Sequence, residues 1–213
     1  MQKRAPKKTL ILYCLCFYAL WICFEFLLKP HIASAVIKTA VIKNAVWTLP
    51  ACLLIHRYSN SVAITLREMF TRRVNWLRYL PVFALFAAYL FAGNMLLNGK
   101  IALSGAFSFD DAVSVLFVGL TEELVFRGWL LNAAAPGKNK RAAIAVNALM
   151  FLLIHIPSWI HRGELITNLQ SFGFVSILVL SVVFSVTFLK SRSILIPAAL
   201  HMFWDLIMLL FYE

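Results

Sequence analysis

The sequence predicts an all-α fold, a polytopic bundle of about seven transmembrane helices with its N-terminus inside. Three observations lead to this prediction. First, 62% of the 213 residues are hydrophobic and 14% are charged, whereas a soluble domain carries about 25% charged residues. Second, the apolar residues form runs of about 20, the length that crosses a hydrocarbon core of about 30 Å. Third, lysine and arginine are concentrated in alternate connectors between these runs.

The predicted spans follow directly from the apolar runs. They cover residues 9–28, 35–55, 77–97, 110–133, 141–157, 168–189 and 193–212. The second span is the weakest, because Lys38, Lys43 and Asn44 interrupt its outer half. We expect these lysines to extend their ammonium groups toward the interface. In the last span, Pro197 has no N–H to bond the carbonyl of Ser193, which predicts a kink.

The positions of the cations predict the orientation. The basic connectors hold Lys3, Arg4, Lys7 and Lys8 at the N-terminus, Arg57, Arg67, Arg72 and Arg73 in loop 56–76, then Lys138, Lys140 and Arg141, and finally Lys190 and Arg192. The alternate connectors hold Lys29, Lys100 and Arg162. Cytoplasmic loops carry the lysine and arginine excess, so the N-terminus is predicted inside and the C-terminus outside. Topology therefore explains the net charge of +11 and no nucleic-acid partner is indicated.

Loop 56–76 is consistent with two structures. As a helix it would place Val62, Leu66, Met69, Phe70 and Val74 on one side and arginines on the other. That pattern is typical of a helix lying on a membrane surface. A solvated basic loop fits the same residues equally well.

A small set of polar residues is predicted to lie deep in the membrane. It consists of Glu122, Glu123 and Arg127 in the fourth span, Asn147 and His155 in the fifth, and His201 and Asp205 in the seventh. Each charged side chain near the bilayer centre costs about 2.5–3.5 kcal/mol, so these residues must face one another inside the bundle. At about 1.5 Å per residue, Glu122, His155 and His201 lie roughly 15, 21 and 12 Å from the inner ends of their helices. Their similar depth predicts one shared cavity.

Spacing within the fourth span separates the two glutamates. Glu123 and Arg127 are four residues apart, on one face of a helix, and close enough to pair. Glu122 is rotated about 100° from Glu123, so the two carboxylates cannot use the arginine equally well.

The same spacing recurs in the fifth and seventh spans. Phe151 and His155 are four residues apart, and Asn147 lies one step further back on the same stripe. His201 and Asp205 are also four residues apart.

Carboxylates and histidines in a dry, shared pocket are suited to activating water. A buried glutamate can take a proton from water, and a histidine can orient that water or share the proton. A second histidine with a polar neighbour can stabilise an oxyanion. Glu122, His155 and His201 are also zinc-ligand types, so a hydrolytic zinc site is chemically reasonable.

Each polar group also has a simpler interpretation. The Glu123–Arg127 pair can lock one helix to its neighbour, and a lone His155 or His201 can serve as a hydrogen-bonding interhelical residue. Intramembrane ionisable groups also line proton and ion pathways, although the sequence shows no internal repeat of the kind that transporters carry. The conjunction of these groups on three helices at one depth favours a reactive site.

Three motifs resemble those of a known family. They are E-E-x-x-x-R at residues 122–127, F-x-x-x-H at residues 151–155 and H-x-x-x-D at residues 201–205, in that order. This pattern is similar to the CAAX-protease and bacteriocin-processing family of intramembrane endopeptidases, also called the Abi or lysostaphin-resistance-protein-A-like family. The resemblance covers about residues 110–212; the first three spans are similar only in being hydrophobic.

The resemblance implies a role for each motif residue. Glu122 and His155 would activate the water, His201 and residue 205 would stabilise the oxyanion, and Glu123 and Arg127 would support the site. The family often has asparagine at the last position, where this chain has Asp205. An ionised Asp205 would repel an oxyanion, so either it is protonated or it orients His201 instead.

The resulting prediction is an intramembrane endopeptidase. Residues 1–109 would form an N-terminal transmembrane region with loop 56–76 in the cytoplasm, and residues 110–213 the catalytic core. The resemblance favours a metal-free mechanism, and zinc held by Glu122, His155 and His201 is the alternative. The substrate would be a small peptide or a membrane-anchored protein in a microbial plasma membrane. A non-catalytic immunity or scaffold protein is the second hypothesis and a transporter the third.

Overall fold

The computed structural model describes residues 6–34, 37–101, 103–104, 108–137 and 139–212, and within these ranges the chain is helical and contains no strand. The elements, in chain order, are α1 (Lys7–Cys23), η1 (Phe24–Leu28), η2 (Lys29–His31), η3 (Ile37–Thr48), α2 (Leu49–Arg57), α3 (Leu66–Thr71), η4 (Trp76–Tyr79), α4 (Leu80–Asn98), α5 (Phe109–Glu123), η5 (Leu124–Leu131), α6 (Asn132–Ala134), α7 (Lys140–Leu153), α8 (His155–Arg162), α9 (Leu165–Gln170), α10 (Gly173–Ser191) and α11 (Leu195–Phe211). The elements η1, η3 and η5 are π-helical, and η2 and η4 are 3₁₀ turns.

Each predicted span coincides with a helical segment, because long apolar runs are the strongest signal in this sequence. Four segments are long and apolar enough to cross a membrane: Lys7–His31, Trp76–Asn98, Lys140–Arg162 and Gly173–Ser191. Leu195–Phe211 is apolar but shorter. Two further segments are less uniformly apolar. The segment η3–α2 carries Lys38, Lys43 and Asn44, and the segment α5–α6 carries Glu122, Glu123 and Arg127. Seven membrane crossings therefore stay a prediction.

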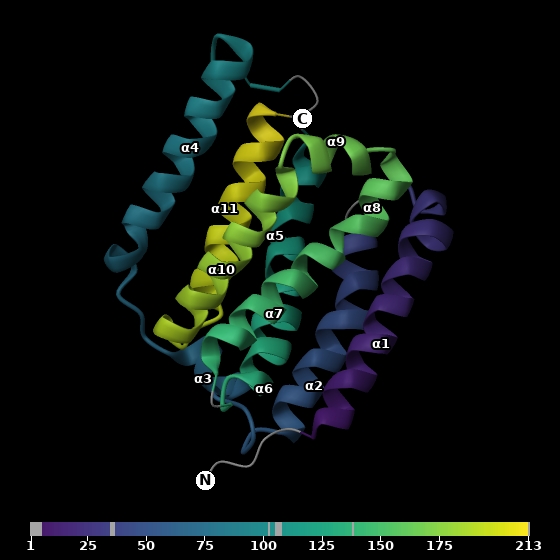
Figure 1. Cartoon of the computed structure of the whole chain (residues 1–213), viewed down its shortest axis with the longest axis vertical. Coiled ribbons are helices and arrows are strands. Elements are labelled where there is room, and N and C mark those ends of the chain that lie inside the picture. The colour runs from purple at the N-terminus through teal and green to yellow at the C-terminus, as the bar shows by residue number, and fades with distance from the viewer. Residues whose placement is uncertain (1–5, 35–36, 102, 105–107, 138, 213) are drawn as a thin grey trace.

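The long helices run in roughly one common direction, whereas the short helix α9 lies across one end of the bundle (Figure 1). The start of α1 lies at the end of the bundle opposite to the end of α11. The connections from α2 to α3, from α6 to α7 and from α10 to α11 lie at the same end as the start of α1. The predicted basic connectors thus gather at one end, although Lys3, Arg4 and Lys138 lie outside the described residues. That this end faces the cytoplasm stays a prediction.

Two details of the helices differ from expectation. Pro197 causes no kink, because α11 begins at Leu195 and the proline stands in its first turn, where a backbone N–H has no helical partner to lose. The sixth predicted span begins later than expected. A separate helix, α9, ends at Gln170, and Phe172 adopts a left-handed φ of 58° before α10 starts at Gly173.

Loop 56–76 forms neither a continuous surface helix nor a fully solvated loop, because part of it is buried at one end of the bundle. Val62, Ile64 and Met69 are buried, and only a short helix, α3, forms. The Asn132 side chain accepts from the Ile64 N–H at 2.8 Å and donates to the Ile64 carbonyl at 2.6 Å. The backbone N–H of Ile194 donates to the Met69 carbonyl at 2.9 Å. These contacts tie the loop to η5–α6 and to the start of α11.

The packing brings segments from both halves of the chain together. In the C-terminal half, α10 packs against α7 and α11, and α11 packs against α5. From the N-terminal half, η3 packs against α5, α2 against η5, and α4 against α11. Buried aromatic residues of α1 and η3, including Phe17, Trp21 and Trp47, contact one another and Phe126 of η5. The N-terminal segments therefore enclose the helix that carries Glu122 and Glu123.

Candidate active site

His155 is placed by a break in the fifth helical segment. α7 ends at Leu153 and α8 begins at His155, because Pro157 has no N–H to donate to the Leu153 carbonyl. Trp21 of α1 covers the break by donating its indole N–H to the Ile154 carbonyl at 2.8 Å. The His155 ring is oriented by a contact of 2.9 Å between its Nδ1 and the carbonyl of Phe151.

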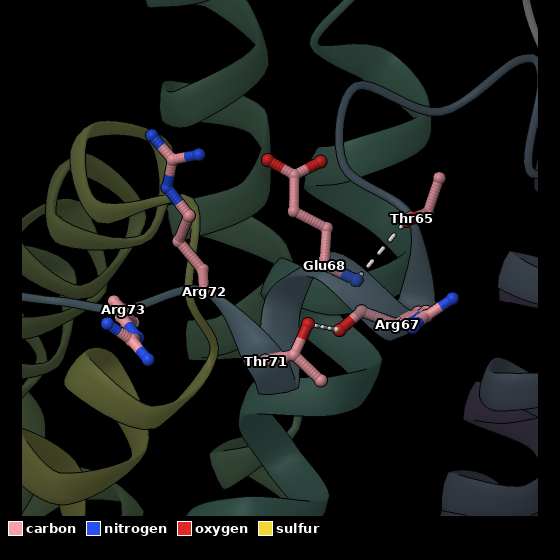
Figure 2. A pocket seen from close by; sticks show the side chains of 6 residues that line it. All are labelled: Thr65, Arg67, Glu68, Thr71, Arg72 and Arg73. Carbon is pink, nitrogen blue, oxygen red and sulfur yellow. Dashed lines mark hydrogen bonds between the residues drawn. The ribbon is translucent and has the colours of Figure 1, made fainter.

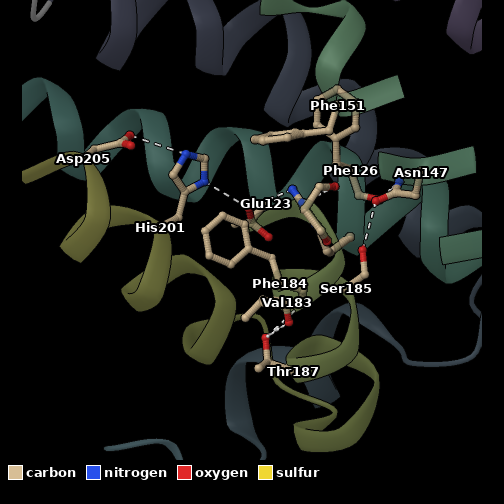
Figure 3. A network of polar contacts seen from close by, with 12 residues as sticks. Glu123, Phe126, Asn147, Phe151, Val183, Phe184, Ser185, Thr187, His201 and Asp205 are labelled. Carbon is tan, nitrogen blue, oxygen red and sulfur yellow. Dashed lines mark hydrogen bonds and ion pairs between the residues drawn. The ribbon is translucent and has the colours of Figure 1, made fainter. Parts of the chain in front are cut away.

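Glu123 lies at the centre of a fully buried network. Arg127 Nη1 donates to Glu123 Oε1 at 2.8 Å, and both side chains have 0% exposure. The predicted ion pair is thus confirmed. His201 Nδ1 lies 3.0 Å from the same carboxylate oxygen (Figure 3), a contact that the sequence did not predict. Arg127 Nη2 donates to the hydroxyl and carbonyl of Ser181 at 2.7 and 3.2 Å. The network therefore joins α5–η5, α10 and α11.

The network extends through His201 to Asp205. His201 Nε2 lies 3.4 Å from Asp205 Oδ2, which confirms the predicted contact between these residues. Figure 3 shows the imidazole ring between the two carboxylates. The Phe184 ring stacks on His201 with centroids 5.1 Å apart, and Phe151 meets the same ring edge-on at 5.7 Å. The Arg127 guanidinium lies over Phe151 at 4.4 Å and over Phe184 at 5.3 Å. Two phenyl rings therefore shield the buried charges.

Asn147 supports the packing around this network. Its side-chain amide donates to the Phe126 carbonyl at 2.8 Å, and Ser185 donates its hydroxyl to Asn147 Oδ1 at 3.3 Å (Figure 3). These contacts cross-link α7 to η5 and α10. Asn147 thus holds the helices that carry the charged residues.

Glu122 faces the other side of α5 and has a different environment. Lys43 Nζ of η3 lies 3.8 Å from Glu122 Oε1, and the two side chains are only 11% and 12% exposed. Beside them, Thr121 donates its hydroxyl to Asn44 Oδ1 at 3.0 Å. Lys43 was expected to reach toward the interface. Instead it points into the bundle, because Glu122 and the Trp21 ring, 4.7 Å away, provide partners there.

A small enclosed cavity borders Glu122. Its walls include Lys43, Trp21, Thr121, Phe126 and Ile154, and it leaves about 10 Å³ for the centre of a water-sized sphere. A space of that size is at the lower limit for one water molecule, and its accessible lining is apolar. Ile154 directly precedes His155, and the charges of Glu122, His201 and Asp205 all act on the His155 ring. None of the described hydrogen bonds joins Glu122 to His155.

The structure does not group Glu122, His155 and His201, the predicted zinc-ligand types, as a three-residue metal site. Both ring nitrogens of His201 already face carboxylates, and Nδ1 of His155 faces the Phe151 carbonyl. Across the part of the chain that the structure describes, no three His, Cys, Asp or Glu side chains are grouped so that they could hold a metal ion.

Two further hollows differ in their relation to this site. One, lined by Thr65, Arg67, Glu68, Thr71, Arg72 and Arg73, lies beside α3 and contains none of the predicted site residues (Figure 2). The other, of about 320 Å³, lies between α5 and α11. Its walls include Asp111 and Asp205, so it opens directly onto the outer end of the buried network.

Comparisons with known proteins give a family match but no individual relative. Those with curated proteins and with solved structures give no significant match. A family model described as type II CAAX prenyl endopeptidase Rce1-like matches residues 104–207. The matched segment contains Glu122, His155, His201 and Asp205 and confirms the resemblance that the motifs indicated. Residues 104–207 are therefore similar to the Rce1-like family, and this similarity implies a CAAX-type intramembrane endopeptidase.

Proposed function

We propose that this protein hydrolyses a peptide bond inside the membrane with a water molecule activated by Glu122 and His155. The observation that carries the proposal is the setting of Glu122. It borders a cavity at the lower limit for one water molecule, within a segment that matches an endopeptidase family. Glu123 has a similar depth but is engaged by Arg127 and His201. Glu122 is therefore the carboxylate that is available to take a proton.

The proposed reaction assigns a role to each group. Glu122 accepts a proton from the water as its oxygen attacks the scissile carbonyl carbon, and His155 orients that water. A carbon–oxygen bond forms, and the carbonyl π electrons move to the oxygen. His201 Nε2, which lies 3.4 Å from Asp205, carries a proton and turns toward the oxyanion to stabilise this charge. The tetrahedral intermediate then expels the amine, which receives the proton from Glu122 as the carbon–nitrogen bond breaks.

Asp205 is proposed to orient His201. Its carboxylate lies 3.4 Å from His201 Nε2, and 30% of the Asp205 side chain is exposed. An aspartate in that position holds the ring in place, and the open hollow beside it gives a substrate a route to the imidazole. This arrangement favours the orienting role over that of a direct oxyanion ligand.

The family description points to the substrate class, a prenylated CAAX protein or a peptide derived from one. We propose a membrane-anchored peptide of this kind as the first substrate to test. The mechanism proposed here uses no metal, because Glu122 itself takes the proton from the water.

The test is cleavage of a prenylated CAAX peptide by purified protein in lipid vesicles. Glu122→Gln and His155→Ala are each expected to lower the turnover rate by about 10²–10⁴-fold, the range for loss of a general base or its partner. Glu164→Gln is the matched control, since Glu164 is an exposed carboxylate that pairs with Arg162 at 3.0 Å. Parent-like cleavage by Glu122→Gln would refute the proposal. Activity that is lost on chelation and restored by zinc would refute its metal-free form.

A further inference from the structure

Lys43 is a buried cation that comes from outside the family-matched segment. It lies on η3, more than 60 positions before residue 104, where the match begins. Its Nζ atom is 3.8 Å from Glu122 Oε1 and 4.7 Å from the centre of the Trp21 ring. Glu25, Lys29 and Asp205 also act on it electrostatically. The residue thus stands at the junction between the N-terminal segments and the active-site helix.

Two adjacent contacts fix the register of η3 against α5. Asn44 accepts a hydrogen bond from Thr121 at 3.0 Å, and Lys43 faces Glu122, the next residue along. Asn44 also donates to the Ala40 carbonyl at 3.1 Å, one turn earlier in its own helix. Lys43 and Asn44 of η3 therefore contact Glu122 and Thr121 of α5, and these two contacts restrict movement of the Lys43 side chain.

The separation of the Lys43–Glu122 pair suits a reactive carboxylate. A charge pair at 3.8 Å is longer than a hydrogen bond, so the lone pairs of Glu122 stay open to a water molecule. By contrast, Arg127 occupies Glu123 Oε1 at 2.8 Å. The Lys43 ammonium therefore lies near the Glu122 carboxylate without blocking its oxygen.

We propose that Lys43 is a positioning residue for catalysis, a cation that the N-terminal region supplies to orient Glu122 beside the small hollow. The proposal rests on the proposed function of Glu122. It assigns that region a part in the chemistry, although the family match does not include it.

The first test measures kcat and KM for cleavage. Lys43→Met, which keeps the side-chain length but removes the charge, is expected to lower kcat by about 10- to 100-fold, the range for loss of a group that orients a reacting side chain. KM should stay near the parent value, because Lys43 acts on the reacting groups and not on substrate binding. Lys43→Arg should recover most of the lost kcat. Lys38→Met, which removes a cation five residues earlier on η3, is the control and should match the parent.

The second test needs no activity. In a thermal unfolding cycle, Lys43→Met and Glu122→Gln should each lower Tm, and the double variant should unfold above either single variant, because removing both partners leaves no lone buried charge. Additive losses would overturn the pairing. A Lys43→Met enzyme with parent kcat, or a Lys43→Arg enzyme as slow as Lys43→Met, would overturn the positioning role. A fully active Glu122→Gln would instead refute the proposed function and leave the unfolding cycle to judge the pair.

Discussion

Glu122 and Glu123 are neighbours in one helix, yet they stand in opposite surroundings. Glu123 is fully buried, and its Oε1 accepts from Arg127 at 2.8 Å and contacts His201 at 3.0 Å. Glu122 keeps 12% exposure, has its cation at 3.8 Å and borders a cavity at the lower limit for one water molecule. Successive helical residues point about 100° apart, so one carboxylate faces the C-terminal helices and the other faces η3. The first is held within a buried network, and the second is the carboxylate that we propose for the chemistry.

The largest effect is expected from removing the cation of the tight network. Arg127→Met leaves Glu123 as an uncompensated buried charge, which typically costs about 3–5 kcal/mol. We expect a large fall in unfolding temperature and a poor yield of folded protein. Arg162→Met, which breaks an exposed pair with Glu164, is the control and should unfold like the parent. A stable Arg127→Met protein would show that the Glu123 network does not hold the bundle together.

A smaller effect is expected from Ser181→Ala. The variant removes the hydroxyl that Arg127 reaches at 2.7 Å but leaves the Ser181 carbonyl, which accepts from the same nitrogen at 3.2 Å. The loss should be about 1.5–3 kcal/mol, the range for a hydrogen bond to a charged group. Denaturant unfolding measures it, and cleavage per folded molecule should stay close to the parent. A large catalytic loss without a stability loss would place Ser181 with Glu122 and not with Glu123.

The smallest effect is expected for the Glu68–Arg192 ion pair, which lies at the basic end of the bundle, away from both Glu122 and Glu123. Glu68 accepts from Arg192 at 2.6 and 3.0 Å, and this hydrogen bond, followed by the charges of Arg192 and Arg72, lowers the pKa of Glu68 below its ordinary value of 4.5. A lowered pKa means that the pair stabilises the fold above pH 4.5 and that this contribution fades as the pH falls further.

Because the Glu68 and Arg192 side chains are 27% and 43% exposed, the pair should contribute no more than about 1 kcal/mol. Glu68→Gln should therefore unfold slightly earlier than the parent at pH 7, and the difference should shrink as the pH falls below 4.5. A difference that stays constant over this pH range would contradict the assignment.

The sequence predicted most of the fold because its strongest signal is local. Runs of apolar residues set the helical segments, and four-residue spacing set the Glu123–Arg127 and His201–Asp205 contacts. Helix ends were predicted less well. The helix is interrupted at Ile154, and α9 is separate from α10. Mean hydropathy does not detect such interruptions, because it averages over the residues on both sides of them.

Contacts between distant helices could not be predicted. Nothing in the sequence indicates that Lys43 meets Glu122 or that His201 shares an oxygen with Glu123, because neither pair is joined by helical spacing. Glu25, 1% exposed and paired with Lys29 at 2.7 Å, was missed for a different reason. Both residues lie near the end of an apolar run, where charges are common and draw no notice.

The most direct test of the account sets Glu122→Gln beside Glu123→Gln and measures cleavage per folded molecule together with unfolding temperature. We predict that Glu122→Gln loses less stability than Glu123→Gln, because its cation is 3.8 Å away, and that it cleaves at least about 100-fold more slowly. Glu123→Gln should lose much more stability, because Arg127 and His201 lose their shared carboxylate. Parent-like cleavage by Glu122→Gln, or a stable Glu123→Gln protein whose folded fraction is inactive, would contradict this division between the two glutamates.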